Sequence, residues 1–261
     1  MGFYGDQLLP RIQNRLMDLK QLRVIRARVC AGLAGDVIEI GFVSGLNLPH
    51  LPPGVTGVWA VDPADLGRRL SERRRDEAPV PVVFAAPDAE HLPFAADRFD
   101  AALSTWTLCT IPDPVQALRE TRRVLKSGGR LALAVWDRPE HNPFSLGRHL
   151  AALGHLEPSP PGTPGPFALS DAGALLELVA GAGLFDAELE RVDVTFHAPS
   201  LDALWDQQRD LSPSAREVVP RLSPAEHYAL RAAVDESWSP YVQHDGSVAL
   251  PGRALCVAAS A

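Results

Sequence analysis

The sequence has little of what marks a secreted, membrane or nucleic-acid-binding protein. Its three cysteines, Cys30, Cys109 and Cys256, stand far apart and lack the spacing of metal ligands, which fits a reducing cytoplasm without disulfides. No apolar run approaches the ~20 residues of a membrane span, and the first residues lack the basic and apolar segments of a signal peptide. We therefore expect a cytoplasmic protein with no bound metal and no membrane partner.

A basic excess is also missing. The net charge is −7 over 261 residues, and the densest basic run, Arg68–Glu77, is interrupted by acids and is interpreted as the solvated face of a helix. A nucleic-acid binder usually carries a basic stripe, so nucleic acid is not expected as a partner. The length is enough to bury a sizeable core in one large α/β domain.

Apolar strands alternate with helical segments in the first half of the chain. Strand patterns cover residues 36–41, 57–62, 80–86, 99–105 and 130–136, and helix patterns cover 5–32, 65–77 and 113–129. Strands alternating with helices indicate βαβ units and a parallel sheet covered on both faces.

The second half is predicted to hold fewer strands. We expect a helix over 170–183 with Ser170 as its N-cap, a long strand over 186–198, helices between 200 and 239, and a last strand over 253–260. Ser223–Glu226 has the form of a capping box. The Pro/Gly-rich stretch 157–167 is interpreted as a surface loop, with an interdomain linker as the alternative.

Glycines follow the first strand in "EIGFVSG" (Glu39–Gly45). Glycine lets a backbone approach a ligand closely, and open parallel sheets bind ligands beyond the carboxyl ends of their strands. Val43 stands where such loops usually carry another glycine. Asp62 ends the second strand, where an acid meets ribose hydroxyls, although it could instead cap a helix. Up to this point the pattern suits NAD or another adenosine cofactor.

Further motifs follow in order, namely "DAEHLPF" (Asp88–Phe94), Phe99-Asp100 and "RVLKSGG" (Arg123–Gly129). With the glycine loop and Asp62, they resemble class I S-adenosylmethionine-dependent methyltransferases, in particular the UbiE/Coq5 and Methyltransf_11 families, over roughly residues 36–137. The resemblance implies a Rossmann-like, doubly wound, seven-stranded sheet, mostly parallel with an antiparallel C-terminal strand, plus a helical lid. It also implies S-adenosylmethionine as cofactor and S-adenosylhomocysteine as product.

The resemblance further implies a cofactor site at the strand ends, formed by Glu39, Gly41, Phe42, Val43, Gly45, Asp62, Pro63, Asp88, Ala89, Ser104 and Thr105. Glu39 and the loop backbone would hold the methionine part and ribose, and Asp62 the ribose hydroxyls. Asp88 would accept from the adenine amino group beside the Ala89 backbone, with Pro63 near the adenine face. Ser104 and Thr105 would face the methionine part or the sulfonium.

Aromatic side chains are the candidates for an apolar acceptor pocket, namely Tyr4, Trp106, Trp136, Trp205, Trp238 and Tyr241. For Trp205, Trp238 and Tyr241 the alternative is the hydrophobic core of the lid. His141, beyond the fifth strand, is the candidate catalytic base, needed only if the acceptor must lose a proton; the alternative is an ordinary loop histidine.

One domain over 1–261 is expected, with a helical cap (1–35), a cofactor-binding core (36–137), a substrate-side half (138–199), a helical lid insertion (200–252) and a final strand (253–261). The leading function is methyl transfer to a small-molecule acceptor, whose acceptor atom (O, N, C or S) stays open. A homodimer is possible as well. The alternatives are a methyltransferase-like protein with cofactor-assisted non-methylating chemistry or lost activity, which Val43 motivates, and a Rossmann-type oxidoreductase. A positive φ at Val43 would cost ~1–3 kcal/mol, so we expect weakened cofactor binding that Val43→Gly tightens.

Overall fold

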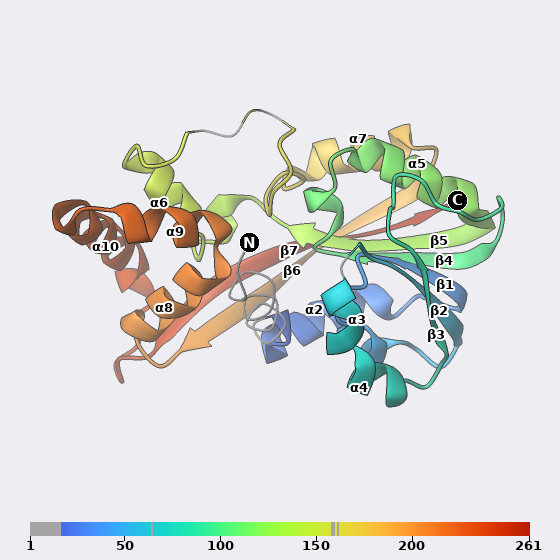
Figure 1. The fold of residues 1–261 in the computed structure, drawn as a ribbon, viewed down its shortest axis with the longest axis horizontal. Coiled ribbons are helices and arrows are strands. Elements are labelled where there is room, and N and C mark those ends of the chain that lie inside the picture. Colours follow the sequence, from blue (N-terminus) through green and yellow to red (C-terminus); the bar gives the residue numbers. More distant parts are fainter. Residues whose placement is uncertain (1–16, 64, 158–159, 161) are drawn as a thin grey trace. The chain divides into compact units, whose positions relative to one another are not determined.

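The computed structural model describes residues 17–63, 65–157, 160 and 162–261 (Figure 1). These residues form two compact units. The core unit comprises Met17–Arg138, Gly162–Val192 and Ala254–Ala261, and the helical unit includes Pro139–Pro161 and Asp193–Arg253. The boundary between the units falls inside two long strands, so the predicted division into one domain with a lid stays a prediction.

A seven-stranded sheet has the order β3-β2-β1-β4-β5-β7-β6. Its strands are β1 (Gly35–Ile40), β2 (Val55–Val61), β3 (Val82–Ala86), β4 (Phe99–Thr105), β5 (Leu125–Trp136), β6 (Phe185–Ala198) and β7 (Val248–Ser260). The pairs among β1 to β5 are parallel, and β7 runs antiparallel to β5. This confirms the predicted doubly wound sheet with an antiparallel C-terminal strand.

Helices cover both faces of the sheet in the core unit. Figure 1 shows α2 (Lys20–Cys30), α3 (Asp65–Leu70) and α4 (Glu72–Asp76) on one face, and α5 (Pro114–Val124) and α7 (Ala172–Gly181) on the other. The apolar core between the sheet and the α5–α7 layer includes the fully buried Phe99, Val124 and Leu133. The chain turns outward from β1 to β3 and returns at β4, so the topological switch point lies between β1 and β4.

Two predicted helices are shorter than their sequence patterns suggested. The pattern over 65–77 is broken between α3 and α4, where the Ser71 hydroxyl donates to the carbonyl of Arg68 at 2.8 Å and competes with the helix backbone. The helix predicted to reach 129 ends at Val124, because Leu125 takes an extended conformation, pairs with Phe99 and is fully buried.

Two other boundaries also differ from the predictions. The N-cap of α7 is Asp171 rather than Ser170, since the Asp171 carboxylate accepts from the N–H of Ala174 at 2.9 Å. The last strand begins at Val248, five positions before the predicted start at Arg253, because Val248 and Leu250 are buried in the helical unit's core.

The helical unit contains α6 (Gly147–Ala152), α8 (Leu201–Leu211), α9 (Pro213–Val218) and α10 (Pro224–Trp238). The predicted capping box is confirmed, with Ser223 and Glu226 bonding each other's backbone at the start of α10. Asn142 is fully buried and bonds both the N–H and the carbonyl of Arg253, at 2.9 and 3.1 Å. It thereby fixes the segment after β5 to strand β7.

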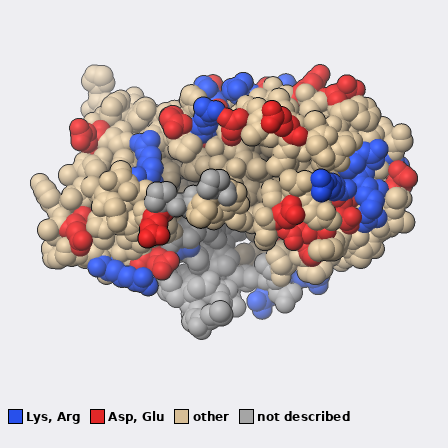
Figure 2. Space-filling view, turned by 90° about the horizontal axis from the view of Figure 1, so that it is seen from above, with Lys and Arg blue, Asp and Glu red and all other residues tan. Residues whose placement is uncertain are grey.

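The described surface mixes both signs of charge. On the face in Figure 2, Lys and Arg side chains are interspersed with Asp and Glu. The basic run around α3 and α4 is more than a solvated face, because Arg68 and Arg75 lie over the ring of Phe84, at 4.5 and 5.1 Å from its centroid. Within the described ranges, no helix is long and apolar enough to cross a membrane.

Candidate cofactor site

The glycine loop begins where β1 ends. Gly41 has a φ of +79°, and a Cβ there would lie 1.9 Å from Oγ1 of Thr107, so a larger residue would collide with the chain after β4. The N–H groups of Gly41 and Phe42 donate to the carbonyl of Val61, at 2.8 and 3.3 Å. The loop is therefore held between the ends of β2 and β4, at the switch point.

Val43 adopts the left-handed conformation that favours glycine, with a φ of +47° and a half-exposed side chain. Its N–H donates to Oδ2 of Asp62 at 2.8 Å. Its carbonyl lies against Gly67, where a Cβ would come within 2.1 Å of that oxygen. Arg74 donates to the carbonyl of the next residue, Ser44, at 3.1 Å. Contacts on both sides of Val43 thus hold the strained backbone in place.

Asp62 lies directly after β2, where the sequence predicted a ribose-binding acid. Its backbone N–H donates to the carbonyl of Ala86 at the end of β3 at 3.0 Å, while its carboxylate bonds the glycine loop. Pro63 is exposed beside it, and Phe42 is buried edge-on against Phe84 with ring centroids 5.4 Å apart. The structure brings these predicted residues together at one edge of the sheet.

A buried polar network extends from the loop to the end of β4. The amide nitrogen of Asn47 donates to Oε1 of Glu39 at 2.8 Å and to Oγ1 of Thr105 at 3.0 Å. The Nη1 group of Arg26, on α2, donates to Oδ1 of Asn47 at 2.8 Å and to Oγ1 of Thr105 at 2.9 Å. The ends of β1 and β4 therefore meet the middle of α2 in one hydrogen-bonded group.

Burial strongly affects both charges of this network. Burial raises the pKa of Glu39 to about 7, against the opposing effects of the Asn47 hydrogen bond and the Arg26 charge. Burial lowers the pKa of Arg26 to about 10, partly offset by the charge of Glu39. Oε2 of Glu39 and Oγ of nearby Ser104 are buried and bond none of the described residues. These are unsatisfied polar groups that a ligand can satisfy.

Trp106 follows β4 with a second positive φ, +53°. Its ring lies 5.3 Å from that of Trp136, at the end of β5, and the Arg26 guanidinium lies 4.8 Å above the Trp106 ring. The Trp106 Nε1 atom is buried and donates to none of the described residues. Two of the predicted acceptor residues are thus in contact beside the buried network.

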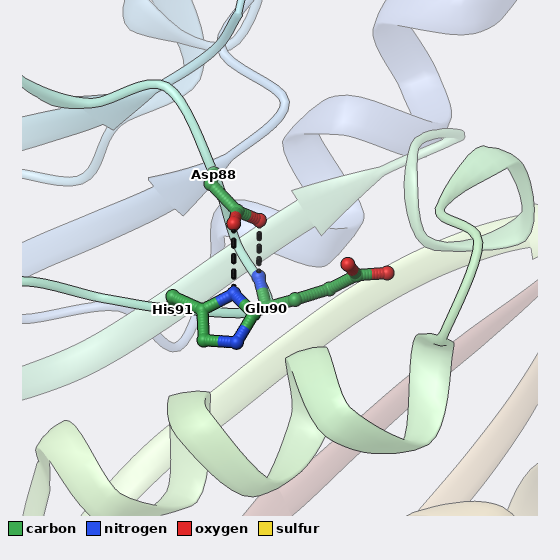
Figure 3. A group of neighbouring side chains, drawn as sticks. All are labelled: Asp88, Glu90 and His91. Atoms are coloured by element: carbon green, nitrogen blue, oxygen red, sulfur yellow. Dashed lines mark hydrogen bonds and ion pairs between the residues drawn. The ribbon is translucent and has the colours of Figure 1, made fainter.

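The predicted adenine corner is held by local bonds (Figure 3). The Asp88 carboxylate accepts from the N–H of Glu90 at 2.8 Å and contacts Nδ1 of His91 at 2.9 Å. The His91 contact lowers the pKa of Asp88, and Asp88 raises the pKa of His91. Ala89 packs against the core. One ligand atom each of Asp88, Glu90 and His91 lies within 4.8 Å of the others, but these groups already bond the protein and we assign no metal to them.

The remaining predicted residues lie in the helical unit or outside the described chain. Trp238 is fully buried and donates to the carbonyl of Pro143 at 2.9 Å, and Trp205 is also buried in this unit's core. Both pack in this core, and Tyr241 packs at its edge, so their part in an acceptor pocket stays a prediction. His141 is exposed in a short turn and its catalytic role stays a prediction. Tyr4 lies outside the described residues.

Sequence reasoning missed Arg26 and Asn47. A signal for Arg26 existed, because it falls at helical spacing with Leu22, Ile25 and Val29, all buried on α2. A charged residue on the apolar face of a helix must find polar partners when it is buried. Asn47 had no comparable signal, since it stands in a loop among residues of mixed type.

The residues at this edge fit an adenosyl cofactor with an amino-acid end. A carboxylate follows β2, and the loop accepts no larger residue at Gly41. Buried polar atoms that bond none of the described residues lie at the ends of β1 and β4. Diols and ammonium groups need carboxylate acceptors, which Asp62 and Glu39 offer.

Comparison with known proteins agrees with this geometry. Residues 38–133 match the model of a family described as a methyltransferase domain. A demethylmenaquinone methyltransferase of Mycobacterium sp. (strain JLS) is 33% identical over 139 residues, which cover 51% of this chain and 57% of that relative. The match thus spans less than two thirds of that relative's length.

Two solved structures share the fold at low sequence identity. The YcgJ protein of Bacillus subtilis has a TM-score of 0.60 at 19% identity, covering 91% of this chain and 96% of that one. Phosphoethanolamine N-methyltransferase 2 of Haemonchus contortus, solved with phosphomonomethylethanolamine and S-adenosylhomocysteine, has a TM-score of 0.57 at 15% identity, covering 99% and 58%.

Residues 38–133, which contain the glycine loop and the switch point, thus match a methyltransferase domain and resemble demethylmenaquinone methyltransferases in sequence. The order of the strands is that of a Rossmann-like methyltransferase fold.

Proposed function

We propose that the protein transfers a methyl group from S-adenosylmethionine to a small-molecule acceptor. The cofactor supplies an electrophilic methyl group on a sulfonium, which a nucleophile displaces in line. The observation that carries the proposal is the gathering of Glu39, Asp62, Ser104 and Thr105 at the switch point, within the segment that matches a methyltransferase domain.

Three of these side chains, and Asp88, have roles that follow from their chemistry, while Thr105 accepts from Asn47 and Arg26. Asp62 accepts hydrogen bonds from the ribose hydroxyls, and Glu39 accepts from the ammonium group of the methionine part. The buried Ser104 hydroxyl supplies a further polar contact near the sulfonium. Asp88 accepts from the adenine amino group, and its contact with His91 keeps the carboxylate charged and oriented.

Support for an aromatic or apolar acceptor comes from two sources. The relative described above is named for demethylmenaquinone, an aromatic quinone. In this chain, the rings of Trp106 and Trp136 lie in tilted contact beside the buried network, and the Trp106 N–H is a donor that an acceptor oxygen can use. His141 serves as base only where the acceptor must lose a proton. Neither nucleic acid nor membrane is required by this chemistry.

Calorimetry with S-adenosylhomocysteine tests the proposal directly. We expect wild-type protein to bind it, and Asp62→Ala to weaken binding by about tenfold or more, because the ribose hydroxyls lose a charged acceptor. Asp62→Asn is the matched control, since it keeps an oxygen that can accept from the Val43 N–H. No binding by the wild type at millimolar cofactor contradicts the proposal, and binding of NADH instead, followed by its fluorescence, supports an oxidoreductase.

A second function is favoured by the positive φ of Val43. A methyltransferase-like protein that binds the cofactor without transferring methyl would give the same calorimetric result. Turnover across a panel of quinols, phenols, amines and thiols, detected as S-adenosylhomocysteine formed, separates the two. Tight binding with no turnover over the panel supports the second function.

A further inference from the structure

Arg26 is a buried cation whose hydrogen-bond partners are neutral. Arg26 is only 5% exposed, and its Nη1 group donates to the amide oxygen of Asn47 and the hydroxyl oxygen of Thr105. Two carboxylates, Glu39 and Asp18, act on the charge of Arg26, but neither accepts a hydrogen bond from it. Glu39 is linked to Arg26 only through Asn47, and Asp18 forms ion pairs with Arg23 and Arg74. A buried guanidinium without a bonded anion is destabilising.

One edge of this guanidinium is still available. Both Nε, which is buried, and Nη2 donate to none of the described residues. Nε and Nη2 together form the edge that binds a carboxylate through two parallel hydrogen bonds. The Trp106 ring covers one face of the guanidinium at 4.8 Å, which holds its plane in a fixed orientation.

The opposite charge lies on the other side of Asn47. Glu39 accepts from the same amide through Oε1, while its buried Oε2 bonds none of the described residues. The side-chain amide of Asn47 therefore stands between the Arg26 guanidinium, which has two unused donor nitrogens, and the Glu39 carboxylate, which has one unused acceptor oxygen. An α-amino acid carries the complementary pair, a carboxylate and an ammonium group on one carbon.

We propose that Arg26 binds the carboxylate of the amino-acid end of the adenosyl cofactor, while Glu39 takes its ammonium group, with Asn47 setting their spacing. This inference rests on the proposed function and deepens it, because it names a residue outside the strand ends that selects a ligand with an intact amino acid. Arg26 is a binding residue here, and the Trp106 ring positions it.

Binding of three adenosyl ligands to wild-type protein tests the inference without any mutation. S-adenosylhomocysteine carries both charged groups, its decarboxylated analogue keeps the ammonium group, and 5′-methylthioadenosine has neither. We expect S-adenosylhomocysteine to bind at least about tenfold more tightly than the decarboxylated analogue, as for loss of hydrogen bonds to a charged group. Equal affinity for these two ligands would overturn the inference and leave the proposed function standing. Failure to bind all three would overturn the proposed function itself.

Variants at Arg26 then locate the effect. Arg26→Met removes the charge at similar length and should weaken S-adenosylhomocysteine by about tenfold to a hundredfold, with less than a twofold change for the decarboxylated analogue. Arg26→Lys keeps the charge without the fork and should fall between the two. An equal loss for all three ligands in Arg26→Met shows a structural role and overturns the inference. If Arg26→Met does not fold, the wild-type ligand series decides the outcome.

Discussion

Replacing Val43 with glycine tests whether this residue strains the glycine loop. Val43 has a φ of +47°, which an L-residue with a branched side chain adopts only under strain. The strain persists because the N–H bonds Asp62, the next carbonyl bonds Arg74, and Gly67 approaches from α3. Glycine at this position removes the strain and keeps every one of these backbone contacts.

The expected size follows from two opposing effects. Relief of the strained backbone is worth roughly 1–3 kcal/mol, while glycine increases the entropy of the unfolded chain and costs about 0.5–1 kcal/mol. Little burial is lost, because the Val43 side chain is 48% exposed. We therefore expect the free energy of unfolding to rise by about 1 kcal/mol in Val43→Gly. We also expect S-adenosylhomocysteine to bind up to about tenfold more tightly, since 1.4 kcal/mol is a factor of ten and the backbone can approach the ligand without a branched side chain.

Urea unfolding and calorimetry on the same preparations measure both quantities. Val43→Ala is the matched control, because alanine removes the branch but keeps a Cβ, and hence most of the strain at positive φ. Its stability should stay near that of the wild type. If Val43→Gly is no more stable and binds no more tightly than the wild type, the strain argument is wrong. If only the free energy of unfolding rises, the strain at Val43 lowers the stability of the fold but does not weaken cofactor binding.

Three further predictions concern buried polar groups. The raised pKa means that native Glu39 holds its proton more tightly than Glu39 in the unfolded chain. The free energy of unfolding of the wild type should therefore fall, relative to Glu39→Gln, by about 2–4 kcal/mol as the pH rises from about 5 to 8. Urea unfolding measures this difference, and a difference that stays constant with pH would contradict the raised pKa. Trp106→Phe keeps an aromatic ring but removes part of its area and an N–H that bonds none of the described residues. Urea unfolding should show the free energy of unfolding fall by no more than about 1–2 kcal/mol, from the smaller ring and its weaker contact with Arg26. A larger loss would show that the N–H has a bonding partner. Asn142→Ala breaks two bonds to Arg253 and should lower the free energy of unfolding by about 1–3 kcal/mol, with Asn142→Asp between, as measured by thermal or urea unfolding; equal stability of all three would refute the bonds.

Most of the fold could be predicted because its signals are local and repeated. Alternating strand and helix patterns indicated the parallel sheet, and the capping box at Ser223 marked the start of α10. The errors arose where tertiary contacts outweigh local preference. Leu125 reads as the continuation of a helix, yet it pairs with Phe99 and is fully buried, so α5 ends before it.

The candidate site divides in the same way. Glu39 and Asp62 were predictable because strand ends and a glycine loop place them, and the resemblance gives them roles. Arg26 could not be placed from the sequence alone, because its partner Thr105 lies 79 residues away in the chain. For Trp205 and Trp238 the sequence left a pocket and a core as alternatives, since aromatic residues alone do not distinguish the two, and in the structure both are buried in the core of the helical unit.

Several costly features meet at this edge of the sheet. Val43 and Trp106 have positive φ values after the neighbouring strands β1 and β4, and Arg26 and Glu39 are buried charges between them. Each strained residue costs of order 1–3 kcal/mol, against a total stability of about 5–15 kcal/mol for a typical domain. Such features persist where a site requires them. Trp106 connects them physically, because its strained backbone presents the ring that covers the Arg26 guanidinium. The strain after β4 therefore supports the orientation of a buried cation, which is the reason to expect a ligand carboxylate there.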